Sequence, residues 1–268
     1  MAVPDILALD FDGVLCDGMG EYFEASRRTC ACVWPDEAAP GAELFASFRA
    51  LRPLILSGWE MPLLLRAIAQ GHAGSAMVQD WEGTRDRLLA SEPRRGPELV
   101  GALTRTLDDV RCAWIAADRG DWLARNVPYC PLDELRRLVA EPERALVVTT
   151  KEGAFARLIL DHWEVRLAGI EGKEAGIHKC ENLRALIAEY GAAHGGRRPA
   201  LWFVEDRLET LRHVTTHPDL EDVALFLASW GYNTPEARAA AGRDARIRPL
   251  ALDQFRRGLS GWAERRPS

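Results

Sequence analysis

The sequence predicts an α/β protein with a doubly wound, parallel, Rossmann-like sheet that is interrupted by a mostly helical insertion. Short apolar runs occur near the start of the 268-residue chain and again in its second half, where helical patterns separate most of them. The long region between has helical periodicity and no convincing strand. Alternation of strands with helices is typical of a parallel sheet covered by helices on its faces.

The first expected strand covers residues 5–10. Its core, "ILAL", is uniformly apolar, as expected of a strand that is buried on both faces. Asp10 and Asp12 end the run, and Gly13 lets the chain turn. Two neighbouring carboxylates repel each other, and burying either one is costly unless a cation or proton donor is close. We therefore expect a positive group at the end of this strand.

The region that follows the first strand reads as helices joined by loops. Apolar residues recur at helical spacing within 97–117, and segments 59–70 and 131–140 are also typical of helices. Proline and glycine punctuate the connections. We expect a helical cap domain at residues 20–140, inserted into an α/β core domain made of residues 1–19 and 141–268.

The second half predicts five further strands, at 144–150, 164–170, 199–206, 222–229 and 246–252. Helices are expected at 152–163, 179–193 and 207–214, followed by one that Thr234 caps with Pro235 in its first turn, and by a last helix at 253–265. Asp10, Thr149 and Asp206 each stand at the end of an expected strand. Ligands bind beyond the carboxyl ends of parallel strands where the strand order reverses, so we expect these three side chains to converge.

Composition narrows the function classes. The net charge of −6 and the pI near 5.6 argue against a nucleic-acid-binding surface. No apolar stretch approaches the ~20 residues that cross a bilayer, and the first residues do not resemble an export signal. Cys30 and Cys32 have no second pair to complete a zinc site, and six cysteines do not suggest a disulfide framework, so we interpret them as small core residues. We expect a cytoplasmic protein that binds neither nucleic acid nor membrane.

The acidic residues at the strand ends predict chemistry at a phosphoryl group. Asp10, Asp12 and Asp206 would offer hard oxygen ligands, which suit Mg²⁺ bridged to a phosphate. Without a cation, a phosphoryl group at ~4 Å from several carboxylates would be repelled by several kcal/mol even at an effective dielectric near 20. The site therefore needs a divalent cation and preferably a lysine. Lys179, at the start of a helix, is our candidate, and Lys173 is the alternative.

Four segments together resemble the haloacid dehalogenase superfamily, most of whose members are phosphatases. "LDFDGVLCD" is similar to the first motif of the family, "LVVTTK" to the second, Lys179 to the third and "FVEDRLETL" to the acidic fourth. The helical insertion resembles the cap that the family carries between its first and second motifs. "WGYNT" and "RIRPLALDQF" resemble a cyanobacterial and plant branch of unassigned substrate.

The resemblance implies a role for each matching residue. Asp10 would be the nucleophile that forms an aspartyl-phosphate. Asp12 would protonate the leaving oxygen and then deprotonate the hydrolytic water. Thr149 would donate a hydrogen bond to a phosphoryl oxygen, and Lys179 would neutralise charge there. Because dehalogenation has no leaving oxygen to protonate, Asp12 disfavours that activity.

The resemblance also implies a magnesium site, with one departure from the family pattern. Mg²⁺ would be held by Asp10, by the backbone carbonyl of Asp12 and by Asp206. The fourth motif usually has Gly before its first aspartate, whereas this chain has Glu205 there. Glu205 is thus a further candidate ligand, although neighbouring residues on a strand point to opposite sides. Glu209 either supplies the later acid of the motif or lies on the exposed face of the next helix.

These features favour a Mg²⁺-dependent phosphomonoesterase that acts on a small phosphorylated metabolite through an aspartyl-phosphate. The altered fourth motif motivates an alternative, a regulatory or binding protein that holds a phosphorylated ligand with little or no turnover. A phosphomutase would need an acid–base residue in the cap, and no residue there is identified as one.

Overall fold

In the computed structural model, which describes residues 3–92, 96–176 and 178–263, the chain forms two compact units. One, the α/β unit, comprises Met1–Asp17 and Val127–Ser268, and the other, the helical unit, comprises Gly18–Asn126. The domain borders expected from the sequence lie after residues 19 and 140. The second border differs because helix α7 (Leu132–Val139) packs on α12 (Leu252–Arg256) of the α/β unit, with Arg256 Nε 2.7 Å from Glu134 Oε2.

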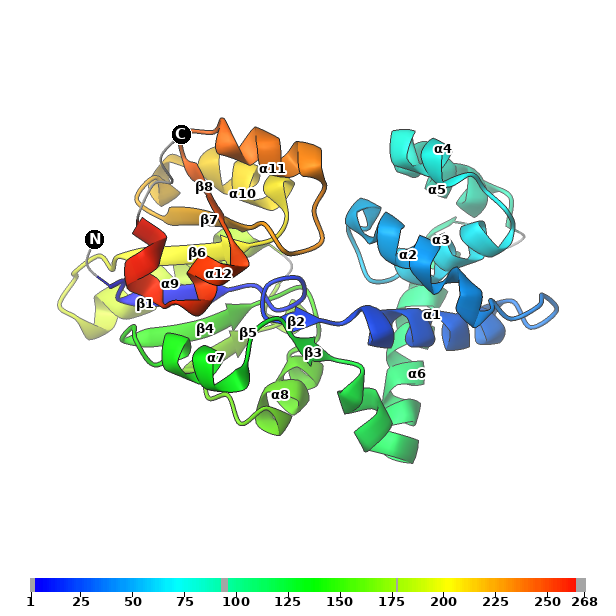
Figure 1. Cartoon of the computed structure of the whole chain (residues 1–268), viewed down its shortest axis with the longest axis horizontal. Helices are drawn as coiled ribbons and strands as arrows, with labels where there is room; N and C mark the ends of the chain where they lie inside the picture. The colour runs from blue at the N-terminus through cyan, green and yellow to red at the C-terminus, as the bar shows by residue number, and fades with distance from the viewer. Residues whose placement is uncertain (1–2, 93–95, 177, 264–268) are drawn as a thin grey trace. The chain divides into compact units, whose positions relative to one another are not determined.

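The α/β unit is built on a six-stranded parallel sheet (Figure 1). In spatial order its strands are β5 (Gly169–Glu171), β4 (Arg144–Val148), β1 (Ile6–Leu9), β6 (Leu201–Glu205), β7 (Ala224–Ala228) and β8 (Ile247–Leu250). The strand order reverses at β1, which pairs with β4 on one side and β6 on the other. The prediction of a doubly wound parallel sheet is confirmed.

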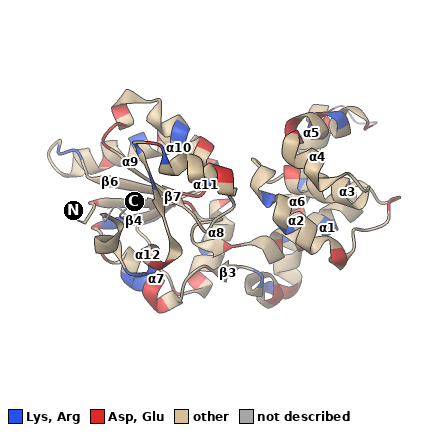
Figure 2. Ribbon diagram, turned by 45° about the horizontal axis from the view of Figure 1, so that its top comes forward, with Lys and Arg blue, Asp and Glu red and all other residues tan. Residues whose placement is uncertain are grey.

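Both faces of this sheet are covered by helices. Figure 2 shows helices α9 (Lys179–Ala193), α10 (Leu208–Thr215) and α11 (Pro235–Gly242) on one side and α7 and α12 on the other. On the α9–α11 side, alternate residues of the strands form a buried core with these helices, including Ile6, Ala8, Leu183, Phe203, Leu211 and Leu225. On the other side, Trp202 and Phe226 of the sheet pack against Trp262. Helix α8 (Gly153–His162) connects β4 to β5.

One helix end that the sequence predicts is observed in the structure, and another is not. The Thr234 hydroxyl accepts a hydrogen bond from the backbone N–H of Ala237 at 3.1 Å, and Pro235 begins α11, as predicted. The single helix expected at 253–265 is wrong: α12 ends at Arg256, Gly258 has φ +92°, and a 3₁₀ helix follows at Leu259–Ala263. A positive φ cannot continue a right-handed helix. Residues 264 and 265 lie outside the described part of the chain.

A short ribbon lies where the chain leaves and re-enters the α/β unit. Strand β2 (Cys16–Asp17) pairs antiparallel with β3 (Val127–Pro128), and Asp17 lies opposite Val127. The two ends of the insertion are therefore adjacent. Neither strand was expected from the sequence, because two residues carry no periodicity.

The helical unit confirms the expected secondary structure of the insertion. Its α-helices are α1 (Met19–Val33), α2 (Phe45–Leu51), α3 (Glu60–Ala69), α4 (Gly74–Gln79), α5 (Trp81–Ala90) and α6 (Gly96–Ala124). Helix α6 buries Leu103, Leu107 and Trp114 at helical spacing. Cys30 is buried as expected, but Cys32 is exposed. Within the described residues, no helix is both long and apolar enough to cross a membrane.

Candidate active site

Asp10 lies directly after β1, and a buried lysine holds it. Its backbone N–H donates to Val204 O at 2.9 Å, which keeps the residue in line with the sheet. Lys179, the first residue of α9, donates from Nζ to Asp10 Oδ1 at 2.7 Å and to Val148 O at 2.5 Å. Lys179 thus joins the ends of β1 and β4. The alternative, Lys173, instead forms a half-exposed ion pair with Glu152 at 3.1 Å.

Two acidic residues from the end of β6 complete this cluster. Glu205 Oε2 lies 3.2 Å from Lys179 Nζ, and Glu205 Oε1 accepts hydrogen bonds from the backbone N–H groups of Asp206 and Arg207. Carboxylate oxygens of Asp10, Glu205 and Asp206 all lie within 4.8 Å of one another. Glu209 is exposed and pairs with Arg207 at 3.7 Å, so it lies on the outer face of its helix.

Two glycines leave the space that Asp206 occupies. Asp206 Oδ2 accepts a hydrogen bond from the backbone N–H of Tyr232 at 2.7 Å. Gly13 has φ +86°, and a Cβ added there would lie 2.0 Å from Asp206 Oδ2. A Cβ at Gly231 would lie 2.3 Å from Asp206 Cβ and 2.4 Å from Gly13 O. Only glycine fits at either position. Sequence reasoning singled out Gly13 but not Gly231, which lies inside the quoted "WGYNT".

A second lysine, which sequence reasoning missed, contacts the second aspartate. Lys151 Nζ lies 3.3 Å from Asp12 Oδ1, and the lysine side chain is buried. The backbone N–H of Lys151 donates to Thr149 Oγ1 at 3.1 Å. Asp12 and Thr149, predicted from separate motifs, are thus linked through one residue. The available signal was the last letter of "LVVTTK", a lysine two residues after the strand-ending threonine.

Burial raises the pKa values of two carboxyl groups of the cluster. Desolvation, reinforced by the charge of Glu205, raises the pKa of Asp10 to about 7, although Lys179 opposes the shift. Desolvation also raises the pKa of Glu205 to about 7, again against the effect of Lys179. Burial would lower the pKa of Lys179, but Asp10 and Glu205 outweigh it and raise that pKa, so the ammonium stays charged.

The net negative charge of the site favours binding of a divalent cation. Among the described residues, the contacts above bring together four carboxylates and two ammonium groups: Asp10, Asp12, Glu205, Asp206, Lys151 and Lys179. Fully ionised, this set carries two excess negative charges. Burial, reinforced by neighbouring negative charge, raises the pKa values of Asp10 and Glu205 in the metal-free protein. Carboxylate oxygens are ligands that Mg²⁺ prefers, so the residues present fit that ion.

Comparison with known proteins gives a match at the level of structure. No protein-family model matches the chain, and no curated protein matches it. A predicted phosphatase from Clostridium acetobutylicum is similar over 96% of this chain and 98% of its own, with a TM-score of 0.59 and 13% identity. A predicted phosphoglycolate phosphatase from Haemophilus somnus is similar over 92% and 94%, with a TM-score of 0.56 and 16% identity.

A hydrolase of the haloacid dehalogenase-like family from Streptococcus pneumoniae is similar over 92% of this chain and 93% of its own, with a TM-score of 0.52 and 14% identity. The chain has the haloacid dehalogenase-like fold. This fold places Asp10 and Asp206 directly after the neighbouring strands β1 and β6, where the strand order reverses, and brings the ammonium of Lys179 from the start of α9 to Asp10.

Proposed function

We propose that the chain is a Mg²⁺-dependent phosphomonoesterase that acts on a small phosphorylated metabolite through an aspartyl-phosphate on Asp10. The observation that carries this proposal is the buried cluster of Asp10, Lys179, Glu205 and Asp206, next to the Asp12–Lys151 pair. Phosphatase neighbours of the same fold support it.

Asp10 would supply the attacking oxygen. Lys179 holds Oδ1 at 2.7 Å and thereby orients the carboxylate, and the other oxygen attacks phosphorus in line. The bond from phosphorus to the ester oxygen breaks as the new bond forms. Asp10 and Asp206, with Glu205 or the backbone carbonyl of Asp12, would hold Mg²⁺, which when bound neutralises charge on the phosphoryl oxygens.

Asp12 would act as the general acid and Lys151 as a phosphate-binding cation. Asp12 protonates the ester oxygen as it leaves and later takes a proton from the water that hydrolyses the intermediate. Lys151 contacts Asp12 in the free protein, and phosphoryl oxygens of a substrate would compete for its ammonium. Thr149 Oγ1 already accepts a hydrogen bond from Lys151 N, so its hydroxyl proton can be donated to the substrate.

One observation favours the second candidate function, a protein that binds a phosphorylated ligand with little turnover. An ammonium group has three protons to donate. Lys179 Nζ lies within 3.2 Å of three acceptors, Asp10 Oδ1, Val148 O and Glu205 Oε2. Glu205 therefore competes directly with a phosphoryl oxygen for this lysine.

Phosphate release from a panel of phosphomonoesters tests the proposal. We expect the purified chain to release phosphate with Mg²⁺ and not with a chelator, and Asp10→Asn to lower kcat at least about a thousandfold, as loss of a nucleophile does. Asp5→Asn is the matched control, since Asp5 lies at the opposite end of the same strand in a partly exposed ion pair with Arg197.

The outcomes separate the two candidates. Tight calorimetric binding of a phosphomonoester without turnover would support the binding protein. Neither Mg²⁺-dependent release nor binding across the panel would contradict both. Equal activity of Asp10→Asn and Asp5→Asn would contradict the assignment of the nucleophile.

A further inference from the structure

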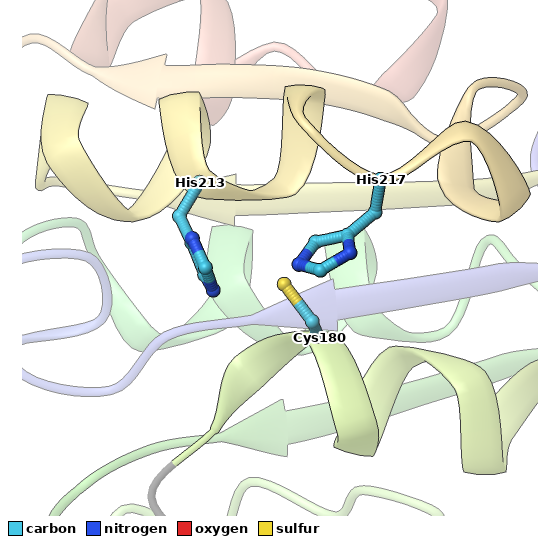
Figure 3. Close-up of side chains that lie close together, drawn as sticks. All are labelled: Cys180, His213 and His217. Atoms are coloured by element: carbon cyan, nitrogen blue, oxygen red, sulfur yellow. The ribbon is translucent and has the colours of Figure 1, made fainter.

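A second group of potential ligands lies on the α9–α11 side of the α/β unit. Cys180, His213 and His217 each offer one ligand atom, and these atoms all lie within 4.8 Å of one another. Figure 3 shows the three side chains directed toward one another from α9, from α10 and from the segment just after α10. The group shares no residue with the acidic cluster.

The fold brings these residues together from two separate parts of the sequence. Cys180 is the second residue of α9 and is buried in the core that α9 and α10 share. His213 lies in the last turn of α10, and His217 directly precedes the 3₁₀ helix at Pro218–Leu220. The two imidazole rings lie edge to face, with centroids 4.9 Å apart.

One nitrogen of this group is buried without a partner. His217 Nε2 has no hydrogen-bond partner among the described residues, whereas His217 Nδ1 lies 3.0 Å from Arg184 Nη2. A buried polar atom without a partner carries an energetic cost, because its hydrogen bonds to water have been lost and not replaced. A ligand at the centre of the group would remove that cost.

We propose that Cys180, His213 and His217 form a binding site for Zn²⁺. A thiolate with two imidazoles suits zinc and similar borderline cations, whereas the all-oxygen acidic cluster suits Mg²⁺. Three protein ligands leave the fourth position of a tetrahedral ion to water. With usual zinc–ligand bond lengths the ligand atoms lie about 3.3–3.6 Å apart, so no pair of ligand atoms has to approach by more than about 1.5 Å. His213 is exposed, which lets its ring make that adjustment.

Metal binding changes the protonation of two ligands. Burial raises the pKa of the Cys180 thiol, against a smaller opposing effect of Arg184, so zinc displaces the thiol proton to solvent. Ligation through His217 Nε2 leaves the imidazole proton on Nδ1, and Arg184 then has to leave that nitrogen. Asp219, which Arg184 already binds through Nε at 2.6 Å, is the nearby carboxylate that can accept the Nδ1 proton in a hydrogen bond.

The site has a structural consequence for the acidic cluster. Cys180 directly follows Lys179, whose ammonium holds Asp10. A bound ion would tie the first turn of α9 to the end of α10. The proposed site would therefore restrain the backbone that positions Lys179.

Metal titration of the full-length chain tests the proposal without using activity. After treatment with a chelator and dialysis, we expect one equivalent of Zn²⁺ to bind in competition with a chromophoric chelator. Co²⁺ in its place should give a thiolate-to-cobalt charge-transfer band. His213→Gln and Cys180→Ser should each weaken Zn²⁺ binding at least about tenfold, since loss even of a residue that only supports a ligand costs 10–100-fold.

Matched variants locate the binding. Cys112→Ser removes an exposed cysteine and should bind Zn²⁺ as the parent does. Asp206→Asn should leave the cobalt band intact, because it alters only the acidic cluster. Cys180→Ser changes the core, so His213→Gln, at an exposed position, is the second variant, with circular dichroism to check its fold. Absence of the band in the parent chain, unchanged binding in His213→Gln, or loss of the band in Asp206→Asn would overturn the proposal.

Discussion

The carboxyls of Asp10 and Glu205 share one buried ammonium, and burial raises the pKa of each to about 7. Their ordinary values are 3.8 and 4.5. Between the ordinary and the raised values, the folded chain retains protons that the unfolded chain has lost. The stability that these two carboxyls contribute to the metal-free protein is therefore lost as the pH rises from about 4 to about 7, because over that range the unfolded state binds fewer protons at them.

Magnesium should reverse this loss. At pH 8 both carboxyls are ionised and are available to the proposed magnesium site, whereas at pH 5.5 protons compete for the same oxygens. We expect saturating Mg²⁺ to raise the Tm more at pH 8 than at pH 5.5, as measured by differential scanning calorimetry.

Asp206→Asn provides the comparison for this measurement. It removes a charge from the cluster while leaving the Asp10–Lys179 pair, so it should shrink the Mg²⁺-induced increase in Tm at pH 8. An equal increase at both pH values, or one that Asp206→Asn does not change, would contradict a magnesium site at these carboxylates.

At the scale of elements, helices α1 and α6 of the helical unit are joined by a buried ion pair. Arg111 donates from Nε to Glu21 Oε1 at 2.7 Å and from Nη2 to Glu21 Oε2 at 3.1 Å. Trp122 Nε1 donates to the same Oε1 at 3.3 Å, and Glu21 is fully buried. Removing one partner leaves an uncompensated charge, which costs about 3–5 kcal/mol.

Arg111→Met should therefore lower the free energy of unfolding of the helical unit by about 3–5 kcal/mol. Hydrogen exchange of peptides from α1 and α6 measures the effect. Arg105→Met, at an exposed position of the same helix, should change the free energy of unfolding by no more than about 0.5 kcal/mol. The double variant Glu21→Gln, Arg111→Met should recover part of the loss, and failure of Arg111→Met to exceed Arg105→Met would contradict the role of the pair.

The elements also show which features the sequence could predict. Most strand and helix positions in the α/β unit followed from apolar runs and their periodicity, although the strand expected at 164–170 lies at Gly169–Glu171. Asp10 and Asp206 followed from the ends of those runs. The alternation of side chains along a strand could not predict the direction of the Glu205 side chain, because β6 ends at this residue. In the structure its carboxylate pairs with Lys179. The only indication of Lys151 was the last letter of "LVVTTK", and it is a weak one, since one lysine after a strand is usually on the surface.

Tertiary placement explains the other differences. The periodicity of α7 marked it as an amphipathic helix but could not say which unit it covers. Cys180 and the two histidines are separated by more than thirty positions in the sequence, so no spacing pattern joined them. Such groups become visible only when α9 and α10 are packed together.

At the scale of the whole molecule, the two units are joined through the ribbon of β2 and β3. Asp17 lies opposite Val127 in this ribbon, so the insertion leaves and returns at adjacent residues. A chain in which an Asn-Gly turn replaces residues 18–126 should therefore form a hairpin there and fold as the α/β unit alone. Circular dichroism should show helices and strands in this shortened chain, and urea titration should show a cooperative unfolding transition.

The domain borders expected from the sequence supply the comparison. Replacing residues 20–140 by the same turn also removes β3 and α7, and with them the contacts between α7 and α12. We expect this chain to show no cooperative transition. Equal stability of the two shortened chains would contradict the observed unit boundaries.

The place of β1 in the sheet bears on how the protein is made. This strand leaves the ribosome first, yet its register partners begin at Arg144 and Leu201. At about 5–20 residues per second, translation delivers β6 about 10–40 s after β1. Until β4 is made the apolar segment Ile6–Leu9 has neither neighbour, so the nascent chain exposes an apolar segment of the kind that chaperones bind, and Asp10 gains its lysine only once α9 has been made.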